Sequence, residues 1–419
     1  MKVYLDNHSA TKLDPEVLDE MLPFFSEHYG NAQSIHDLGV KAKDAVEKSR
    51  FKVAQLINCG PEEIIFTSCG SESNNLAIKG VALAYKEKGK HIITSAIEHF
   101  SVLNSLEHLK KFFGFEYTVL PVDKYGVVNI DEFKNALRDD TVLVSIQLAN
   151  SEIGTIQPIK KLVSIVKEFN TQKKERQIKT LFHTDAVAAC GIIPADVKEL
   201  DVDLFSLSAS QLHGPKGIAA LYVRKGVRII PQIDGGIQEG GRRAGTENVV
   251  CIVGMGKAAE ITKQKLNENY NKMLLLRDKL IQEVPKRVKY VYLNGHPVER
   301  LPNNVNFSFE FIEGESILLL LNQKGIYVSS GSACVSKTLK LSHVLKSIGV
   351  DPAVGQGSIV FTLSRYTTQQ EVDYVLDQIT PIIERLRSIS PLYDYFLKTG
   401  QRMLTTSDKS YDVHEEEQN

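Results

Sequence analysis

The sequence contains no tryptophan, few cysteines and no long hydrophobic run. Its five cysteines are an odd number, widely scattered and without a Cys-x-x-Cys pair, which argues against a disulfide framework or a cysteine-based zinc site. We expect most of them to be small buried apolar residues. Apolar runs such as residues 317–321 are far shorter than the ~18 residues of a membrane span, so no membrane protein is predicted.

An excess of charge of one sign is also missing. Fifty lysines and arginines stand against 51 aspartates and glutamates, a net charge of -1, so no overall field attracts the chain to nucleic acid or acidic membranes. The first 17 residues have neither the apolar core of a signal peptide nor the Arg/Ser-rich character of a transit peptide. We therefore expect a soluble cytoplasmic protein with no nucleic-acid or membrane partner.

What is present is an alternation of helical and β-branched stretches between about residues 40 and 230, which is typical of a parallel sheet with crossover helices. Helical spacing of apolar residues predicts helices at 74–87, 101–113, 130–137 and 159–169, with Ser101 and Asp131 as helix-start residues. Strands are predicted at 63–68, 91–95, 117–121, 141–148, 181–184, 204–208 and 218–223. The sequence therefore predicts an α/β fold with a mostly parallel seven-stranded sheet and flanking helices.

The sequence pattern changes after about residue 260 to a long charged helical stretch followed by short strands, which predicts a second, smaller α+β domain. With 419 residues, 42% of them hydrophobic, the chain is long enough for two domains. We predict a large domain over 1–258, whose segment 1–20 packs on the small domain, and a small C-terminal domain over 259–395 that carries the Cys334 loop. Residues 396–419 form a polar acidic tail with little to bury.

Two segments after predicted strands contain groups that suit a bound cofactor. Residues 66–78, FTSCGSESNNLAI, place a glycine- and serine-rich turn before a helix, where free backbone N–H groups, Gly70 and the Ser71 hydroxyl suit an anion. The alternative interpretation of the same residues is an ordinary strand-to-helix turn with a helix cap. His99 follows the next strand, where its ring can stack on a planar cofactor or play a structural part.

Three further positions have residues that suit binding or catalysis. Asp185 ends an apolar strand, where a buried carboxylate requires a cationic partner or several donors; a protonated pyridine nitrogen is one such partner. The glycine-rich stretch around Thr246 suits a phosphate or a subunit contact, and a flexible exposed loop is the alternative. Cys334 lies among small residues in VSSGSACVSK, which is typical of a mobile nucleophile or sulfur carrier.

Taken together, these segments resemble the pyridoxal-phosphate (PLP)-dependent cysteine desulfurases (NifS/IscS-like) of the class V aminotransferase superfamily. The matching runs are YLDNHSATKLDPEV, GNAQSIHDLG, LANSEIGTIQPI, HTDAV, HGPKGIAALYVRKG, GGRRAGTENV, SSGSACVS and RYTTQQEVDYV, spanning about residues 3–390. The resemblance implies a fold-type-I PLP-dependent transferase. It also implies a homodimer whose mobile cysteine loop takes sulfur from a cysteine–PLP adduct as a persulfide.

The resemblance assigns roles to individual residues. Cys334 matches the persulfide acceptor, His99 the ring-stacking histidine, Asp185 the pyridinium partner and Asn150 the residue near the substrate and the cofactor oxygen. The phosphate ligands correspond to Ser71, preceded by Gly70, to Ser208 and, from the neighbouring subunit, to Thr246.

The chain departs from the family in the reactive part of the same pocket. Gln211 replaces the Schiff-base lysine, and an amide can neither form that bond nor move a proton as a base. Ser210 replaces the preceding histidine, Ala188 a glutamine that bonds the cofactor's phenolic oxygen, and Val360 an arginine that holds the substrate carboxylate. A lost positioned acid–base group costs about 100- to 10,000-fold in rate, so we expect ordinary cysteine turnover to be nearly abolished.

Three hypotheses follow. The first is a pseudoenzyme of sulfur trafficking and iron–sulfur cluster assembly, with Cys334 as persulfide acceptor or metal-cluster contact and a sulfur acceptor or iron–sulfur scaffold protein as partner. The second is an enzyme that binds PLP, or its amine form PMP, without a Schiff base and uses another acid–base group, for which His213 is the nearest candidate. The third is a structural partner of an active desulfurase paralogue, with no cofactor required.

Overall fold

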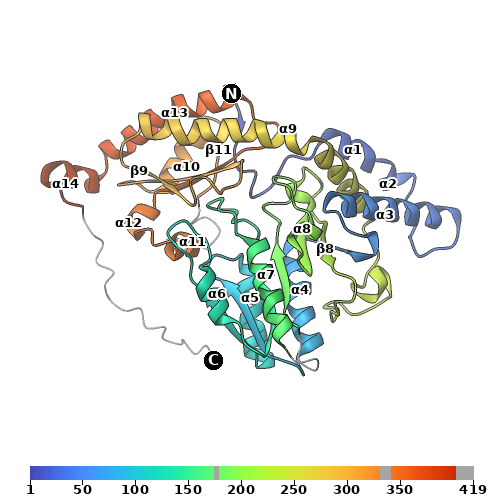
Figure 1. Ribbon diagram of the computed structural model, residues 1–419. Helices are drawn as coiled ribbons and strands as arrows, with labels where there is room; N and C mark the ends of the chain where they lie inside the picture. Colours follow the sequence, from blue (N-terminus) through green and yellow to red (C-terminus); the bar gives the residue numbers. More distant parts are fainter. Residues whose placement is uncertain (174–178, 331–340, 403–419) are drawn as a thin grey trace, which may run out of the picture.

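The computed structural model describes residues 1–173, 179–330 and 341–402 (Figure 1). Its central element is a seven-stranded sheet with the strand order β2-β8-β7-β6-β5-β3-β4. The strands are β2 (Ile64–Thr67), β3 (His91–Ser95), β4 (Glu116–Leu120), β5 (Thr141–Ser145), β6 (Leu181–Asp185), β7 (Leu204–Ser208) and β8 (Ala219–Val223). Paired strands run parallel except at β8, which is antiparallel to both β2 and β7. The predicted α/β fold with a mostly parallel seven-stranded sheet is confirmed, and the strand ends move by at most three residues.

Helices cover both faces of this sheet because successive strand residues point to opposite sides. In β2, Ile65 belongs to one apolar core while Ile64 and Phe66 belong to another. The Ile65 face is covered by α4 (Gly70–Tyr85) and α5 (Phe100–Phe113). The opposite face is covered by α3 (Asp37–Leu56), α6 (Ile130–Ala136), α7 (Ile159–Gln172), α8 (Val197–Leu200) and the first part of α9 (Val249–Arg287).

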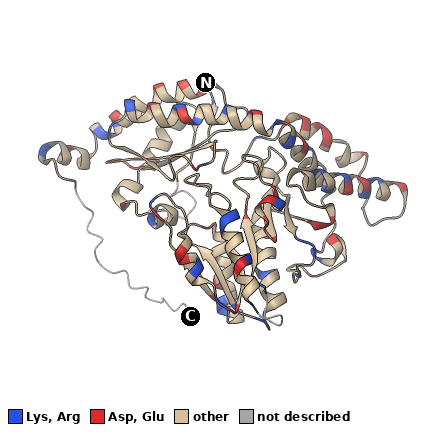
Figure 2. Cartoon of the chain, viewed as in Figure 1, with Lys and Arg blue, Asp and Glu red and all other residues tan. Residues whose placement is uncertain are grey.

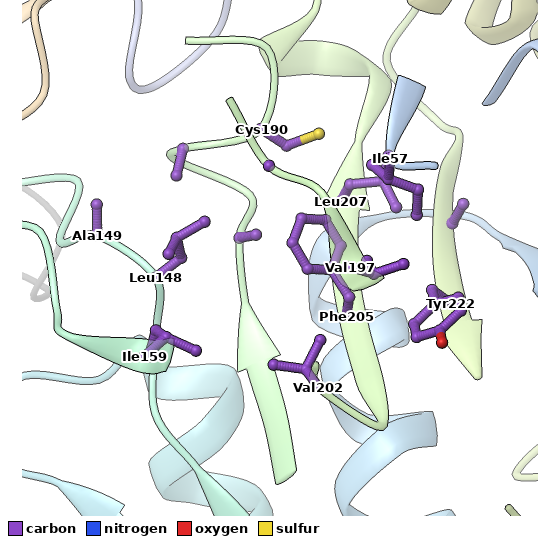
Figure 3. Close-up of a cluster of buried hydrophobic side chains, with 14 of the residues drawn as sticks. Ile57, Leu148, Ala149, Ile159, Cys190, Val197, Val202, Phe205, Leu207 and Tyr222 are labelled. Carbon is purple, nitrogen blue, oxygen red and sulfur yellow. The ribbon is translucent and has the colours of Figure 1, made fainter. Parts of the chain in front are cut away.

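Figure 3 shows part of the second core, where Phe205 and Leu207 of β7 lie beside Ile57 and Val197. Phe205 and Leu207 are fully buried, and truncating such a phenylalanine to alanine costs about 3–5 kcal/mol. The strand that ends at Ser208 is therefore held rigidly from one side, which fixes the position of the turn that follows it.

A smaller sheet forms a second region with its own core. Its order is β12-β10-β9, all antiparallel, with β9 (Val291–Asn294), β10 (Asn304–Phe309) and β12 (Ser358–Thr362). It packs with α10 (Gly314–Gln323), α13 (Gln369–Ser388) and the second part of α9. Val3 and Leu5 from the N-terminal segment lie in this core, and β1 (Val3–Tyr4) pairs in parallel with β11 (Ile326–Tyr327).

One helix belongs to both regions. Helix α9 is 39 residues long, with Met255 in the core of the large sheet and Met273 in that of the small one. Figure 1 shows α9 lying beside α13 along the top of the view, and the two helices are in contact. The predicted boundary between residues 258 and 259 lies inside this helix, so the division into domains stays a prediction.

The remaining described elements are short: α1 (Pro15–Met21), α2 (Pro23–Ser26), α11 (His343–Ser347), α12 (Pro352–Gly355), α14 (Pro391–Thr399), and the 3-10 turns η1 (Pro61–Glu63), η2 (Ala209–Gln211) and η3 (Gln238–Gly241). The tail predicted from residue 396 begins inside α14, and residues 403–419 lie outside the described residues. Within the described chain, no helix has the length and apolar character needed to cross a membrane. Figure 2 shows acidic and basic residues intermingled over the helices, without a large field of one sign.

Three local predictions were wrong. Helix α6 is capped by Asn129 and α5 by His99, two residues before the predicted Asp131 and Ser101, because the side chains of Asn129 and His99 accept the free N–H groups of the first turn. Of the four cysteines among the described residues, only Cys190 is buried, whereas Cys59 and Cys251 are half-buried and Cys69 is exposed. Cys69 is the N-cap of α4 and does not belong to the apolar face of that helix.

Candidate functional site

Four of the candidate side chains follow the carboxyl ends of parallel strands, where ligands bind in open α/β sheets. Asp185 ends β6 and Ser208 ends β7, while His99 and Asn150 follow β3 and β5. The strands β3, β5, β6 and β7 are consecutive neighbours in the sheet. The fold therefore brings these four residues to one edge of the sheet.

Asp185 is a buried carboxylate without a cationic partner. One carboxylate oxygen, Oδ1, accepts the Val187 N–H at 2.9 Å, and Oδ2 accepts Asn74 Nδ2 at 2.7 Å. Both donors are neutral, and among the described residues no lysine or arginine pairs with it. Burial raises the pKa of Asp185, although these two hydrogen bonds act in the opposite direction. The site thus contains an acid that is costly to ionise unless a cation binds beside it.

The N-terminus of α4 lies next to the turn after Asp185. A Cβ on Gly70 would come within 2.7 Å of a Val187 methyl group, so the absence of a side chain permits this approach. Ser71 is exposed in the first turn of this 16-residue helix, and no bond of its hydroxyl is recorded among the described residues. Free N–H groups and a hydroxyl in this position suit an anion.

The loop that carries Thr246 is tied to the same helix end. Arg243 Nε donates to Glu72 Oε1 at 2.9 Å, while Ser68 donates to Glu72 from its backbone and its hydroxyl. Burial opposes ionisation of Glu72, but these bonds lower its pKa. Thr246 lines a cavity of about 170 Å³ together with Thr67 and Ser68. The loop is therefore anchored beside the α4 N-terminus of its own chain.

The side-chain amide of Asn150 is used mainly in hydrogen bonds to the neighbouring backbone. Its Oδ1 accepts the N–H groups of Glu152 and Ile153, and its Nδ2 donates to the Ile97 carbonyl at 2.9 Å. Asn150 is 3% exposed. These bonds link the ends of β5 and β3, so the residue shapes the sheet edge and keeps only one amide hydrogen for another partner.

The residues expected to depart from the family pattern make their polar contacts within the chain. Gln211 Nε2 donates to the His8 carbonyl at 2.9 Å, and the Ser210 carbonyl accepts the Thr11 hydroxyl at 2.7 Å. The hydroxyl groups of Ser210 and Ser208 lie 3.0 Å apart. The N-terminal segment thereby fastens the turn that carries residue 211.

The other two departures are apolar positions. Val360 is fully buried in β12, and its backbone exchanges two hydrogen bonds with Ser329. Ala188 is half-buried and packs against the core of the large sheet. Neither position supplies a charge or a hydrogen-bonding side chain to this edge.

His213 is not free to act at the surface of the site. It is 6% exposed, its Nδ1 donates to the Lys12 carbonyl at 2.8 Å, and its ring contacts that of Tyr366 edge to face. Burial lowers the pKa of His213 to about 4. It is therefore a weak base at neutral pH.

Cys334 lies outside the described residues, as do 331–333 and 335–340. On the two sides of this segment, the Ser329 hydroxyl lies 3.2 Å from His8 Nε2, and the Ser342 hydroxyl donates to Glu152 Oε2 at 2.7 Å. Burial raises the pKa of Glu152 to about 7. The sequence analysis identified neither His8 nor Glu152, because their partners are more than 180 residues away in the chain.

Comparisons with known proteins agree with this geometry. The family model described as Aminotransferase class-V matches residues 3–375. The chain belongs to the class V aminotransferase family. A cysteine desulfurase IscS from Methanosarcina thermophila is 52% identical over 390 residues, which cover 93% of this chain and 94% of that protein. Another cysteine desulfurase IscS, from Dictyoglomus turgidum, is 52% identical and is covered to 96%.

Solved structures of class V members have the same fold. A NifS-like protein superposes with a TM-score of 0.85 and 41% identity, covering 92% of this chain and all of that chain. The fold-type-I expectation and the resemblance to cysteine desulfurases are thus confirmed. The family is PLP-dependent.

The described residues suit noncovalent contacts to PLP, but they do not supply the lysine for its covalent attachment. Asp185 lacks a cation and suits a protonated ring nitrogen. Ser71 and Ser208 offer hydroxyl groups near the ends of β2 and β7. At position 211, however, the side chain is an amide already bonded to His8.

Proposed function

We propose that this chain is a desulfurase-like protein of sulfur trafficking and iron–sulfur cluster assembly that does not release sulfur from free cysteine by the usual route. The observation that carries the proposal is Gln211, whose side chain donates to the His8 carbonyl and has no amine to offer. PLP, when bound, would supply an electron sink for the amino-acid substrate. Ser71, His99, Asp185 and Ser208 are the residues that would hold it.

The loss of proton transfer and of substrate binding supports the same conclusion. An amide at 211 cannot move a proton at the substrate's α-carbon, and His213 is a weak base held by Lys12 and Tyr366. Val360 leaves a substrate carboxylate without its charge-assisted bond, which is worth about 2 kcal/mol. The loss of proton transfer and the loss of carboxylate binding affect the same reaction, the release of sulfur from free cysteine.

Sulfur transfer through Cys334 requires none of the missing groups. In such a step the Cys334 thiolate attacks the outer sulfur of a donor persulfide, a new S–S bond forms, and the donor leaves as a thiolate. The donor is the persulfide of an active desulfurase, and an acceptor or scaffold protein takes the sulfur onward. Cys334 as a metal-cluster contact belongs to the same proposal.

We also infer a homodimer. Several large apolar side chains are exposed between residues 22 and 35 and on the loop before Thr246, and exposed apolar surface is typical of protein interfaces. They include Leu22, Phe25, Tyr29, Ile35 and Ile237, with Ile35 98% exposed. A partner subunit would cover these residues, and a mixed dimer with an active paralogue would use the same surface.

A second candidate function, PLP or PMP bound without a covalent bond, is favoured by Asp185. A buried carboxylate without a cation is unfavourable for the free chain, and a cationic ring nitrogen beside it would remove that cost. In this case the nearest candidate for the missing acid–base group is His213, whose low pKa makes it a weak base.

The first experiment measures sulfide release from free cysteine by the purified protein with PLP added. We expect none above the buffer control, and release at rates typical of an enzyme would overturn the proposal. Borohydride reduction followed by peptide mass spectrometry should find no lysine that carries the cofactor. Equilibrium dialysis with PLP then tests the second candidate function, which requires the cofactor, and absence of binding would exclude it.

The second experiment incubates the protein with cysteine and an active desulfurase, then alkylates the thiols and identifies persulfides by mass spectrometry. We expect the added sulfur on Cys334 and its loss in Cys334→Ser. Cys69→Ser is the matched control, because Cys69 is an exposed thiol outside the Cys334 segment. An unmodified Cys334 beside labelled Cys69 would refute the carrier role.

A further inference from the structure

We propose that Ser101 and Asn74 hold His99 in the tautomer that carries its ring proton on Nε2. His99 then offers the site a hydrogen-bond donor and cannot serve as the base that residue 211 no longer supplies. Ser101 and Asn74 are positioning residues in this scheme. The tautomer is a property of the chain alone, whereas its consequence for catalysis rests on the proposed function.

The orientation of the Asn74 amide is set by Asp185. Asn74 is 1% exposed, and its Nδ2 lies 2.7 Å from Asp185 Oδ2 and 2.9 Å from the Ser101 hydroxyl oxygen. In this orientation the amide nitrogen faces the Asp185 carboxyl group, and both amide hydrogens are used, one for Asp185 and one for Ser101.

The direction of the next bond follows. The Ser101 oxygen accepts from Asn74, so the single hydroxyl hydrogen of Ser101 is free to point elsewhere. Its nearest partner is His99 Nδ1, at 2.7 Å. The network therefore runs from His99 through Ser101 and Asn74 to Asp185, joining the two residues assigned to the cofactor ring.

A second donor reaches the same ring nitrogen. The backbone N–H of Ser101 donates to His99 Nδ1 at 3.1 Å, because His99 is the N-cap of α5. A backbone N–H can only donate, so Nδ1 must be the acceptor. In a neutral imidazole the other nitrogen then carries the proton. A proton on Nδ1 would remove the bond from the Ser101 N–H and reverse the direction of the bond with the Ser101 hydroxyl.

The two histidines of the site region consequently differ. His213 Nδ1 faces the Lys12 carbonyl and must donate to it, which leaves its Nε2 as an acceptor. His99 has the opposite arrangement, with a donor at Nε2. A donor can bind or protonate an electron-rich atom, but it cannot remove a proton. His99 thus keeps a binding role after the loss of the lysine.

The test is a long-range ¹H–¹⁵N correlation spectrum of the full chain labelled at the histidine rings, without cofactor. The spectrum is recorded about two pH units above the usual histidine pKa, with His99→Gln used to assign the signal. We expect an unprotonated Nδ1 and a protonated Nε2 at His99. Ser101→Ala should shift the tautomer ratio about fivefold toward Nδ1–H, the effect of one net hydrogen bond, and Ser101→Thr should restore it.

Ser105→Ala is the matched control, because the Ser105 hydroxyl bonds the Ser101 carbonyl in the same helix and does not touch His99. A dominant Nδ1–H form in the unaltered chain would overturn the proposal, as would equal effects of Ser101→Ala and Ser105→Ala. Sulfide release does not enter this measurement. An active enzyme with the expected tautomer would contradict the proposed function alone.

Discussion

The site contains two groups of residues that the protein satisfies to different degrees. The ring side consists of His99 and Asp185, and Glu98 directly precedes His99 in the chain. Burial raises the pKa values of both carboxyl groups, Glu98 and Asp185. The substituted side, Ala188, Ser210, Gln211 and Val360, has neutral side chains that pack or hydrogen-bond within the chain. The buried carboxyl groups of the first group lower the stability of the free protein. The neutral side chains of the second group carry no such cost.

This difference indicates where a function persists. Groups that are unfavourable for folding are kept where a ligand or reaction needs them, so Asp185 is a feature that binding explains. A relaxed set of residues at positions 188, 210, 211 and 360 needs no such explanation. The proposed function assigns a cofactor-ring contact to the first group and a lost reaction to the second, and four measurements test this difference.

The largest effect is expected from rebuilding the substituted side. We expect sulfide release from cysteine by the fourfold variant Gln211→Lys/Ser210→His/Ala188→Gln/Val360→Arg. Gln211→Lys alone should bind PLP covalently. Its rate should stay at least about 100-fold below that of the fourfold variant, because other positioned groups are still missing. Gln211→Met in the rebuilt background is the control for side-chain length without an amine. Full activity from Gln211→Lys alone would show that the substituted side does not act as a unit.

Next in size is the effect of Glu98→Gln on stability. Glu98 is fully buried, and burial raises its pKa to about 8. Since the folded pKa lies above the unfolded one, stability is full below about pH 4 and falls as the pH rises toward 8. The glutamine should remove this loss, worth roughly 3 kcal/mol at pH 7, while keeping the bonds from Ser95 and Gln147. Denaturant unfolding at pH 4 and 7 measures it, and equal gains at both pH values would contradict the assignment.

Asp185→Asn should have opposite effects on the free and the loaded protein. Removing the buried charge should stabilise the free chain at pH 7 by about 2 kcal/mol, because the Asn74 amide can turn its unpartnered Oδ1 toward the new side chain. The same change should weaken PLP binding. Thermal unfolding with and without PLP tests both effects, and Asp203→Asn, another partly buried acid with a raised pKa, is the control. If both measurements moved in the same direction, Asp185 would not be a ligand-directed group.

The smallest effect concerns the link between the Thr246 loop and α4. A double-mutant cycle of Arg243→Gln and Glu72→Gln should give a coupling of about 1 kcal/mol, since this ion pair is only partly buried. The coupling should fall as salt is raised. Lys398→Gln with Asp394→Gln provides a highly exposed pair for comparison. Equal coupling for the two pairs would mean that the anchored loop is no better fixed than the surface.

Much of the fold was predictable because the large sheet is built from local signals. Most of its strands are short apolar runs, and β2 to β6 alternate with helices, so β3 and β7 were predicted to the residue. Cap positions were less predictable, because His99 caps α5 through its ring nitrogen, which composition does not reveal. The contact of β1 with β11 joins residues more than 300 positions apart and has no local signal.

The sequence by itself determined which chemical groups are present and which are missing, because an amide at residue 211 is not an amine in any fold. It also determined the family, through motifs spread along the whole chain. What those groups face is a property of the folded chain. The lack of a cation at Asp185 and the bond from Gln211 to His8 depend on atoms brought together from distant segments. Hydrogen-bond direction and burial are properties of that arrangement, and no residue carries them alone.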